Sequence, residues 1–275
     1  MDQKDLIKKI VGEMDQKELV ERIVTEVMSK LAAAGQAVRP AGAPAAGAKG
    51  ILGPAEMARY IDHTMLRPEA PLEVFDKLCA EALQYSFFSV CVNSCRVAYV
   101  ARKLRGTGVK VCSVIGFPLG AMASRAKAFE AHGALEDGAA ELDMVLNIGA
   151  LKSRDVKYVE EDIRSVRRAS HGTTILKVII ETALLTQEEK VLACEIAKKA
   201  GADFVKTCTG FGGGEATPED IALMRRTVGP AMGVKASGGV RSFEKAMTLI
   251  NAGATRLGAV AGVAIVTGAV GKSSY

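Results

Sequence analysis

The 275-residue sequence contains no tryptophan, and aromatic residues make up only 5% of it. A chain so poor in aromatics is not typical of an aromatic-rich β-sandwich or a lectin-like surface. It also lacks any run of 18 apolar residues, which argues against a membrane-spanning helix. What it does contain is 28 glycines, abundant alanine and 49% hydrophobic residues. This composition predicts helices packed closely against strands around a sizeable core.

Histidine is scarce, and the cysteines show no paired spacing. The three histidines are far apart, with no HxH or HxxxH pattern, which argues against a histidine-based metal centre. There is no CxxC motif, and most cysteines lie in apolar runs, so we expect reduced, buried thiols in a cytosolic protein. The histidines are His63, His132 and His171, and the cysteines are Cys79, Cys91, Cys95, Cys112, Cys194 and Cys208.

Charges of both signs are spread along the chain. The 36 basic and 31 acidic residues give a net charge of +5. There is no long basic run with interleaved aromatics, so the sequence does not predict a nucleic-acid partner. A small anionic substrate remains compatible with this balance.

The first 31 residues form a separate segment with an internal repeat, because MDQKDLI at positions 1–7 returns as MDQKELV at 14–20. The second copy continues with apolar residues at helical spacing, which predicts an amphipathic helix with a break near Gly12 and a cap at Asp15. Residues 32–53 are then predicted to be a mobile linker, since residues 32–50 include nine alanines, four glycines and two prolines. The apolar residues of the helix are Leu19, Val20, Ile23, Val24, Val27, Met28 and Leu31.

A short amphipathic helix on a tether is typical of a docking segment, and the alternative is a solvated or coiled-coil helix. Its six basic and seven acidic residues fit neither a signal sequence nor an acid-poor transit peptide. The ELVERIVTEVMSKL stretch at 18–31 resembles the encapsulation peptides that recruit enzymes into bacterial microcompartments. The resemblance implies a shell-protein partner and a cytoplasmic location within such a compartment.

Residues 54–275 predict one α/β domain in which strands and helices alternate. Eight strand-like segments, each followed by a helical stretch, favour a (β/α)8 TIM barrel. The alternative is a doubly wound sheet, but the GxGxxG pattern of a dinucleotide site does not follow the first strand. The predicted strands cover residues 60–66, 87–92, 109–115, 141–148, 174–181, 203–207, 232–236 and 255–259.

Three similar segments support the barrel. Each begins with a Gly-Ala turn and runs into a strand, at 138–143, 201–206 and 253–258. The sixth positions are Asp143, Lys206 and Gly258. Equivalent positions on different barrel strands converge, so we expect a carboxylate, an amine and a glycine to meet.

Three lysines lie inside apolar strands, where an ammonium group is costly to bury. These are Lys177, Lys206 and Lys235. One interpretation is a set of structural ion pairs with Asp143 and Glu181. The other is a Schiff-base lysine, whose pKa is lowered by a neighbouring cation so that the free amine attacks a carbonyl.

Glycines after the seventh and eighth strands predict an anion site. The segment KASGGVR at 235–241 places Gly238 and Gly239 between a strand and a helix, and Gly258 follows on the next strand. Backbone N–H groups there form a phosphate site in many barrels. A tight turn alone would also explain the Gly-Gly pair.

Taken together, these motifs make residues 54–275 resemble the deoxyribose-phosphate aldolases, which are class I aldolases on a (β/α)8 barrel. The resemblance implies reversible cleavage of 2-deoxyribose 5-phosphate into acetaldehyde and glyceraldehyde 3-phosphate. The shared stretches are IDHT at 61–64, VCVN at 90–93, VIGFPLG at 114–120, ELD at 141–143, LKVIIET at 176–182, FVKTCTG at 204–210, ATP at 216–218 and KASGGVR at 235–241.

The resemblance also implies roles for individual residues. Lys206 would form the imine, Lys235 would hold down the pKa of Lys206, and Asp143 with Lys235 and a water would relay the proton of the 3-hydroxyl. The protonated imine is the electron sink, so neither a metal nor a cofactor is implied. The substrate and phosphate would be bound by Asp62, Lys177, Gly210, Gly238, Gly239 and Gly258; for Asp62, a cap or an ion pair beside His63 is an equal alternative.

The end of the chain carries a resemblance and a departure. Tyr275 resembles the terminal tyrosine that some members use to protonate the enamine, although a terminal tyrosine is more often a plain chain end. Where the family usually has serine after Gly258-Ala259, this chain has Val260. The lost hydroxyl should weaken phosphate binding by about 1 to 3 kcal/mol, which favours a related or unphosphorylated substrate as a second hypothesis.

A third hypothesis belongs to a different class of protein. With residues 1–31 as its main functional part, the chain would be an assembly component whose barrel has weak activity. The presence of Asp143, Lys206 and Lys235 argues against it. Since members of the aldolase family are often dimers, the resemblance also implies a homodimer.

Overall fold

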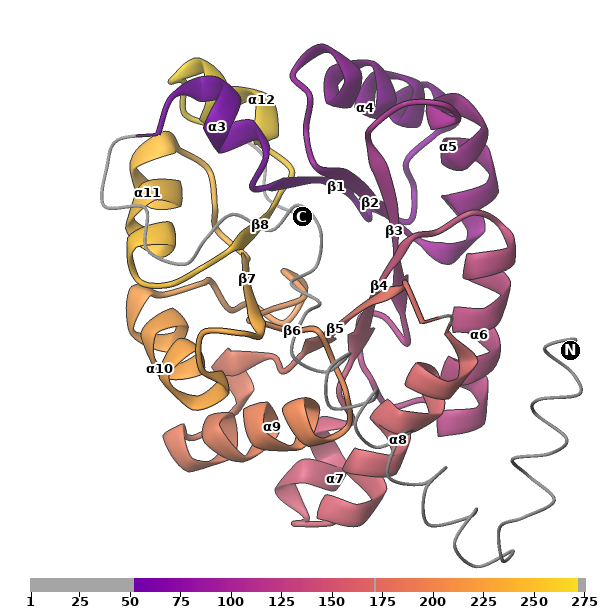
Figure 1. Cartoon of the computed structure of the whole chain (residues 1–275), viewed down its shortest axis with the longest axis vertical. Coiled ribbons are helices and arrows are strands. Elements are labelled where there is room, and N and C mark those ends of the chain that lie inside the picture. The colour runs from indigo at the N-terminus through magenta and orange to yellow at the C-terminus, as the bar shows by residue number, and fades with distance from the viewer. Residues whose placement is uncertain (1–51, 171, 272–275) are drawn as a thin grey trace, which may run out of the picture. The chain divides into compact units, whose positions relative to one another are not determined.

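The structure is a computed structural model that describes residues 52–170 and 172–271 (Figure 1). The predicted helix at 1–31, all but the last two residues of the predicted linker at 32–53, and Tyr275 lie outside the described residues. The eight strands are β1 (Ile61–Met65), β2 (Ser89–Val92), β3 (Lys110–Ile115), β4 (Glu141–Val145), β5 (Ile175–Ile179), β6 (Phe204–Lys206), β7 (Gly233–Ser237) and β8 (Arg256–Ala259).

Helices precede the first strand and follow every strand. The α-helices are α3 (Pro54–Ala58), α4 (Leu72–Gln84), α5 (Val97–Leu104), α6 (Ser124–Glu136), α7 (Ile148–Lys152), α8 (Val156–Ala169), α9 (Gln187–Lys199), α10 (Pro218–Val228), α11 (Phe243–Asn251) and α12 (Gly262–Thr267). Two short 3-10 helices are η1 (Ser94–Arg96) and η2 (Thr182–Leu184).

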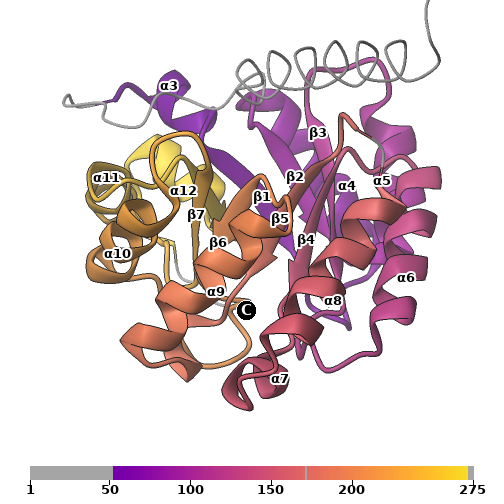
Figure 2. The same cartoon turned by 60° about the horizontal axis from the view of Figure 1, so that its bottom comes forward.

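The strands form a closed parallel barrel. Each strand pairs with the next along the chain, and β1 also pairs with β8, where Asp62 lies opposite Gly258. Figure 1 shows the strands as a central ring surrounded by helices, and Figure 2 shows α6, α8, α9 and α10 on the outside of that ring. The predicted (β/α)8 fold is confirmed.

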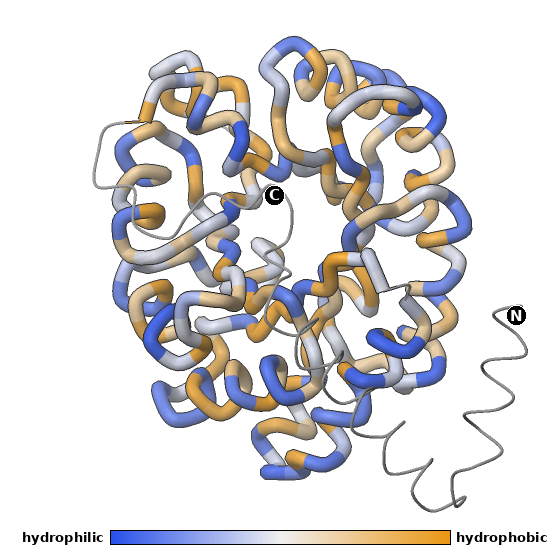
Figure 3. Tube along the Cα trace, viewed as in Figure 1, coloured by the Kyte–Doolittle hydropathy of each residue, from blue (hydrophilic) through white to orange (hydrophobic). Residues whose placement is uncertain are grey.

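Side chains along each strand alternate between the helices and the barrel interior. On β4, Leu142 and Met144 belong to the main hydrophobic core, whereas Glu141 and Asp143 occupy the alternate positions. On β6, Val205 packs in the same core, and the side chain of the next residue, Lys206, lies on the opposite side of the strand. Figure 3 shows that the outer helices carry both apolar and hydrophilic residues, which alternate along each helix. The lysines of the apolar strands therefore point into the barrel.

All eight predicted strands are present, but two of them end two or more residues earlier than predicted. The predicted strand at 141–148 ends at Val145, because the side chain of Asn147 accepts a hydrogen bond from the Ala150 N–H at 3.1 Å and begins α7. The predicted strand at 174–181 ends at Ile179, and Glu181 has a left-handed φ of 55° at the start of η2.

Five cysteines are buried as predicted, whereas Cys95 is exposed, and none of the six, all of which are described, forms a disulfide. Within residues 52–170 and 172–271, no helix is long and apolar enough to cross a membrane.

Candidate active site

Seven charged side chains from six strands meet inside the barrel, and each of these residues is at most 2% exposed. Each of them occupies a position of its strand whose side chain points into the barrel. Residues that are far apart in the sequence therefore meet in the barrel interior. The sequence predicted five of them as site residues and did not predict Glu141 and Arg256. The seven are Asp62, Glu141, Asp143, Lys177, Lys206, Lys235 and Arg256.

Asp143 lies at the centre of this cluster. Its Oδ2 accepts hydrogen bonds from Lys206 Nζ at 2.9 Å and from Lys235 Nζ at 2.7 Å. Its Oδ1 accepts one from Lys177 Nζ at 2.7 Å and one from the Cys112 thiol at 3.2 Å. The carboxylate thus joins three lysines from β5, β6 and β7, and Lys206 and Lys235 share one of its oxygens.

Asp62 anchors the other side of the cluster. Its Oδ2 lies 2.5 Å from Lys235 Nζ, and its Oδ1 accepts from Arg256 Nη1 at 2.8 Å and from the Ser89 hydroxyl at 2.7 Å. Asp62 is wholly buried among these groups, so it forms ion pairs and does not cap a helix. The neighbouring His63 has a different partner, because its Nε2 contacts Glu81 at 2.8 Å.

Glu141 connects the two halves. Its Oε2 lies 2.6 Å from Lys177 Nζ and 3.0 Å from Arg256 Nη1. Arg256 also lies over the ring of Phe88, with its guanidinium carbon 3.5 Å from the ring centroid. The cation–π contact and the two carboxylate partners fix the position of the guanidinium.

Burial and charged neighbours displace the pKa values of Asp143 and Lys235. Burial by itself would raise the pKa of Asp143, but the charges of Lys177, Lys206 and Lys235 outweigh it and hold that pKa well below the ordinary value. Burial would likewise lower the pKa of Lys235, yet Asp143 and Asp62 raise it above its ordinary value. Asp143 is therefore ionised and Lys235 is a permanent cation at neutral pH.

Lys206 differs from the other cations in its number of carboxylate partners. It forms one salt bridge in the described part of the chain, to Asp143. Lys177 contacts three carboxylates, and Lys235 and Arg256 each contact two. The cluster holds four basic and three acidic groups, so a neutral amine at Lys206 would leave three cations facing three carboxylates. Lys206 is also 2% exposed, whereas Lys177 and Lys235 are wholly buried.

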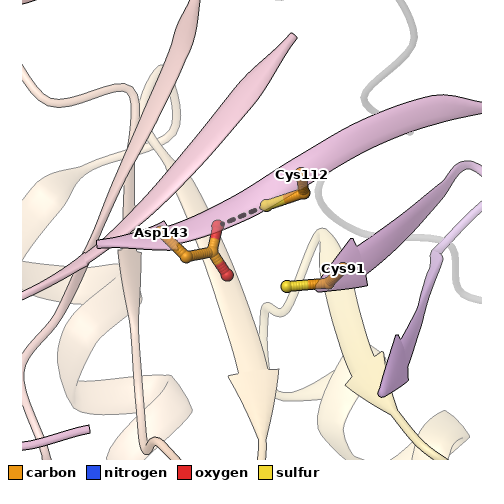
Figure 4. A group of neighbouring side chains, drawn as sticks. All are labelled: Cys91, Cys112 and Asp143. Atoms are coloured by element: carbon orange, nitrogen blue, oxygen red, sulfur yellow. Dashed lines mark hydrogen bonds between the residues drawn. The ribbon is translucent and has the colours of Figure 1, made fainter. Parts of the chain in front are cut away.

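Two thiols lie beside Asp143, as Figure 4 shows. Cys91 and Cys112 are paired across β2 and β3, and their sulfur atoms and an Asp143 oxygen all lie within 4.8 Å of one another. Thiolate and carboxylate donors at this spacing are the kind that bind a soft divalent metal. A metal there would first have to displace the lysines that already contact Asp143.

The predicted phosphate-binding glycines also come together. The loops after β6, β7 and β8 form one pocket of about 210 Å³. Gly238 and Gly239 have φ of 90° and 71°, a backbone conformation that L side chains rarely adopt. The lining consists of Gly210, Gly213, Gly214, Glu215, Gly238, Gly239, Val240, Arg241, Gly258, Ala259 and Val260.

Gly258 has a second role in the site. A Cβ there would lie 3.0 Å from the Ser237 Cβ and 3.1 Å from the Lys235 Cε. The absence of a side chain therefore leaves room for Lys235 to reach Asp143. The repeat that aligned Asp143, Lys206 and Gly258 in sequence places them around one interior, as expected.

Glu181 lies outside the charge cluster, although one of the two interpretations of the sequence paired it with the lysines. Its Oε2 accepts from the Thr209 N–H at 3.1 Å and the Thr209 hydroxyl at 2.6 Å. Its left-handed backbone carries the side chain to the β6–α10 loop rather than into the barrel. The signal that could have found Glu141 and Arg256 is the one that found the lysines: a charge within an apolar strand.

The fold and the buried lysine cluster define a (β/α)8 enzyme of the aldolase class. The chain belongs to the DeoC/LacD family of aldolases, whose family model matches residues 56–268. Deoxyribose-phosphate aldolase from Clostridium perfringens is 60% identical over 220 residues, which cover 80% of this chain and 98% of the relative. The Enterococcus faecalis enzyme of the same name is 59% identical over 217 residues, 79% of this chain and 99% of the relative.

Solved structures of deoxyribose-phosphate aldolases are also similar to this chain. Deoxyribose phosphate aldolase from Aeropyrum pernix, described as tetrameric, matches with a TM-score of 0.73 and 34% identity, covering 78% of this chain and 91% of that one. The first 55 residues of this chain precede the part that the family model matches. The N-terminal segment is therefore additional to the family domain.

Proposed function

We propose that the chain catalyses the reversible cleavage of 2-deoxyribose 5-phosphate to acetaldehyde and glyceraldehyde 3-phosphate through a Schiff base on Lys206. The observation that carries this proposal is the contact of Lys206 Nζ with Asp143, an acceptor that Lys235 shares, in a buried part of the barrel. Family membership and relatives at 59 to 60% identity support the same reaction.

Lys206 attacks the C1 aldehyde of the open-chain sugar as a neutral amine, and loss of water gives a protonated imine. Lys235 stays charged because two carboxylates contact it. This fixed cation lies close to Lys206, because the two lysines share one oxygen of Asp143. The protonated imine carries one positive charge. The net charge of the barrel interior is therefore the same as with a protonated Lys206.

Asp143 supports the next step. Its depressed pKa keeps it ionised, so it accepts the proton of the substrate 3-hydroxyl, with Lys235 and a water in the relay. The C2–C3 bond then breaks, its electron pair enters the iminium, and glyceraldehyde 3-phosphate leaves. We assign Asp62 and Lys177 to holding this charge pattern and the substrate hydroxyls, since both contact the same cluster.

Two remaining roles complete the cycle. The backbone groups of Gly210, Gly238, Gly239 and Gly258 line the pocket proposed for the phosphate. Tyr275 is proposed to protonate the enamine before hydrolysis releases acetaldehyde. Tyr275→Phe should slow deuterium exchange into acetaldehyde while leaving imine formation intact; exchange at the original rate would contradict this role.

Borohydride reduction in the presence of acetaldehyde tests the mechanism. We expect a reduced adduct on the peptide that contains Lys206, and no adduct and no cleavage in Lys206→Ala. The control is Lys190→Ala, which removes a lysine paired with Asp220 outside the barrel interior and should still label at Lys206. Labelling elsewhere, or cleavage by Lys206→Ala, would show that the mechanism is wrong.

Val260 favours a second candidate, a class I aldolase that acts on a related or unphosphorylated sugar. Val260 lines the phosphate pocket without offering a hydroxyl donor, and backbone groups are left to bind the anion. Comparing cleavage of 2-deoxyribose 5-phosphate with that of 2-deoxyribose separates the two candidates.

We propose that residues 1–31 recruit the enzyme to the shell of a bacterial microcompartment in the cytoplasm. Support comes from the apolar residues at helical spacing and from the position of this segment before the family domain. Residues 1–31 fused to a fluorescent protein should co-localise with shells. The combined substitutions Leu19→Asp, Ile23→Asp and Val27→Asp should abolish the co-localisation. Diffuse fluorescence of the unaltered fusion would contradict it.

Association of the chain with itself is a separate proposal, that of a homodimer. Phe129 on α6 and Leu119 in the preceding loop are 80% and 75% exposed, which leaves apolar surface for a second copy.

The third hypothesis, that the chain is chiefly an assembly component, is tested by turnover assays. If it held, turnover would be weak both with and without residues 1–50.

A further inference from the structure

The phosphate pocket contains a carboxylate that its proposed ligand would repel. Among the described side chains that line the pocket, two are charged, Glu215 and Arg241. Glu215 Oε1 accepts a hydrogen bond from Arg241 Nη2 at 3.1 Å. The arginine of the lining is therefore paired with a carboxylate, and the two charges cancel.

Glu215 also lies against the glycine turn itself. A Cβ on Gly239 would be 2.4 Å from Glu215 Cδ and 2.5 Å from Glu215 Oε2. The carboxylate thus rests on the bare Cα of Gly239, within the group of backbone N–H donors proposed to bind the anion. Its side chain is 52% exposed, so it faces solvent at the pocket mouth rather than the protein core.

The third relevant side chain is Val260, which gives the pocket an apolar wall. A phosphate monoester carries a charge between about −1.5 and −2 at neutral pH. Such an anion would meet a carboxylate, a neutralised arginine and a methyl surface, with backbone N–H groups as its main donors. Hydroxyl groups of an uncharged sugar end would face no such repulsion.

We propose that Glu215 is a specificity-determining residue, which lowers the preference of the enzyme for a phosphorylated substrate end over an uncharged one. This inference rests on the proposed aldolase function and concerns the end of the substrate remote from Lys206. Glu215 acts by like-charge repulsion and by holding Arg241 away from the anion. Removing its charge frees the arginine and removes the repulsion together.

The test compares kcat/KM for 2-deoxyribose 5-phosphate and for 2-deoxyribose in the full-length enzyme and in Glu215→Gln. We expect the ratio of the two values to rise about tenfold in Glu215→Gln at low salt, and this gain to shrink near 1 M NaCl, where charges are screened within about 3 Å. Inhibition by inorganic phosphate should become tighter by a similar factor. The matched control is Glu219→Gln, an exposed carboxylate in the first turn of α10 outside the pocket lining, which should leave the ratio unchanged.

The outcomes separate the two proposals. An unchanged or lower ratio in Glu215→Gln, or an equal rise in Glu219→Gln, would overturn the role of Glu215 while aldolase turnover stands. A rise that persists at high salt would overturn the electrostatic cause. If the full-length enzyme cleaves neither sugar and gives no adduct on Lys206, the proposed function fails, and this inference fails with it.

Discussion

At the scale of single residues, Asp143 is the carboxylate that all three lysines of the cluster contact. It contacts three lysines from three strands, and each contact serves a different part of the proposed cycle: Lys206 as nucleophile, Lys235 as fixed cation and Lys177 as anchor. Substituting Asp143 should therefore separate imine formation from bond cleavage.

Asp143→Asn keeps the size of the side chain but removes the charge that accepts the 3-hydroxyl proton. We expect kcat for cleavage to fall by about 10² to 10⁴. The borohydride adduct on Lys206 should still form, though more slowly. Asp220→Asn, which alters a lysine–aspartate pair outside the site, is the control and should keep kcat. Cleavage by Asp143→Asn at the original rate would exclude the proposed role.

The same residues predict how stability depends on pH. The pKa values of Asp143 and Asp62 lie below the ordinary value in the folded state, whereas each is about 3.9 in the unfolded chain. As the pH falls below about 5, the unfolded chain takes up protons that the folded chain does not, so the free energy of unfolding decreases. The decrease continues until the depressed pKa values are reached.

Urea unfolding between pH 7 and pH 3 measures this dependence. Each depressed carboxylate should add a slope of up to about 1.4 kcal/mol per pH unit in the acid range. Asp143→Asn should show a shallower decrease than the unaltered chain, because one of the two groups no longer titrates. Equal slopes would show that Asp143 does not have a depressed pKa.

At the scale of elements, a second buried ion pair joins the helices to the barrel. Lys127 on α6 donates to Asp162 Oδ2 on α8 at 2.6 Å and to the carbonyl of Val145 at the end of β4 at 2.9 Å. Both charged side chains are wholly buried. Because the lysine satisfies a carboxylate and a strand carbonyl, it fixes α6 and α8 relative to β4.

Lys127→Met should destabilise the protein by about 3 to 5 kcal/mol, since Asp162 would be left as an uncompensated buried charge. The double substitution Lys127→Met with Asp162→Leu should recover most of that loss, because no charge remains buried. Denaturant unfolding of the two variants and of Asp162→Leu alone completes the cycle. A loss below about 1 kcal/mol for Lys127→Met would show that the pair is not needed.

The elements themselves could be predicted because most strands are short apolar runs next to a Gly-Ala or glycine-rich turn. The ends of the strands were harder to predict. A helix cap formed by the Asn147 side chain and a left-handed backbone at Glu181 follow two strands within sequence that is still apolar. Such endings depend on local geometry that hydrophobic pattern does not carry.

At the scale of the whole molecule, the family domain and the N-terminal segment are proposed to act separately. The family model begins at residue 56, and the curated relatives are covered almost completely by about 220 residues of this chain. The charge cluster and the glycine pocket lie entirely within the family domain.

Deleting residues 1–50 should change kcat/KM for cleavage by less than about twofold, because about 220 residues of this chain already cover 98% and 99% of the two named relatives. The same deletion should abolish co-localisation of the enzyme with shells in cells. Turnover assays of the purified chains and fluorescence microscopy provide the two readouts. A large loss of turnover on deletion would show that the segment contributes to the barrel.

The sequence alone determined the alternation of strands and helices, the inward phase of the buried lysines and the glycines at the strand ends. It could do so because these features depend on residues adjacent in the chain. The tertiary structure decided which charges meet. Arg256 contacts Asp62 across 194 positions of sequence, whereas Glu181, which one interpretation of the sequence paired with the lysines, contacts Thr209. Barrel closure brings β8 against β1, and no local pattern specifies that contact.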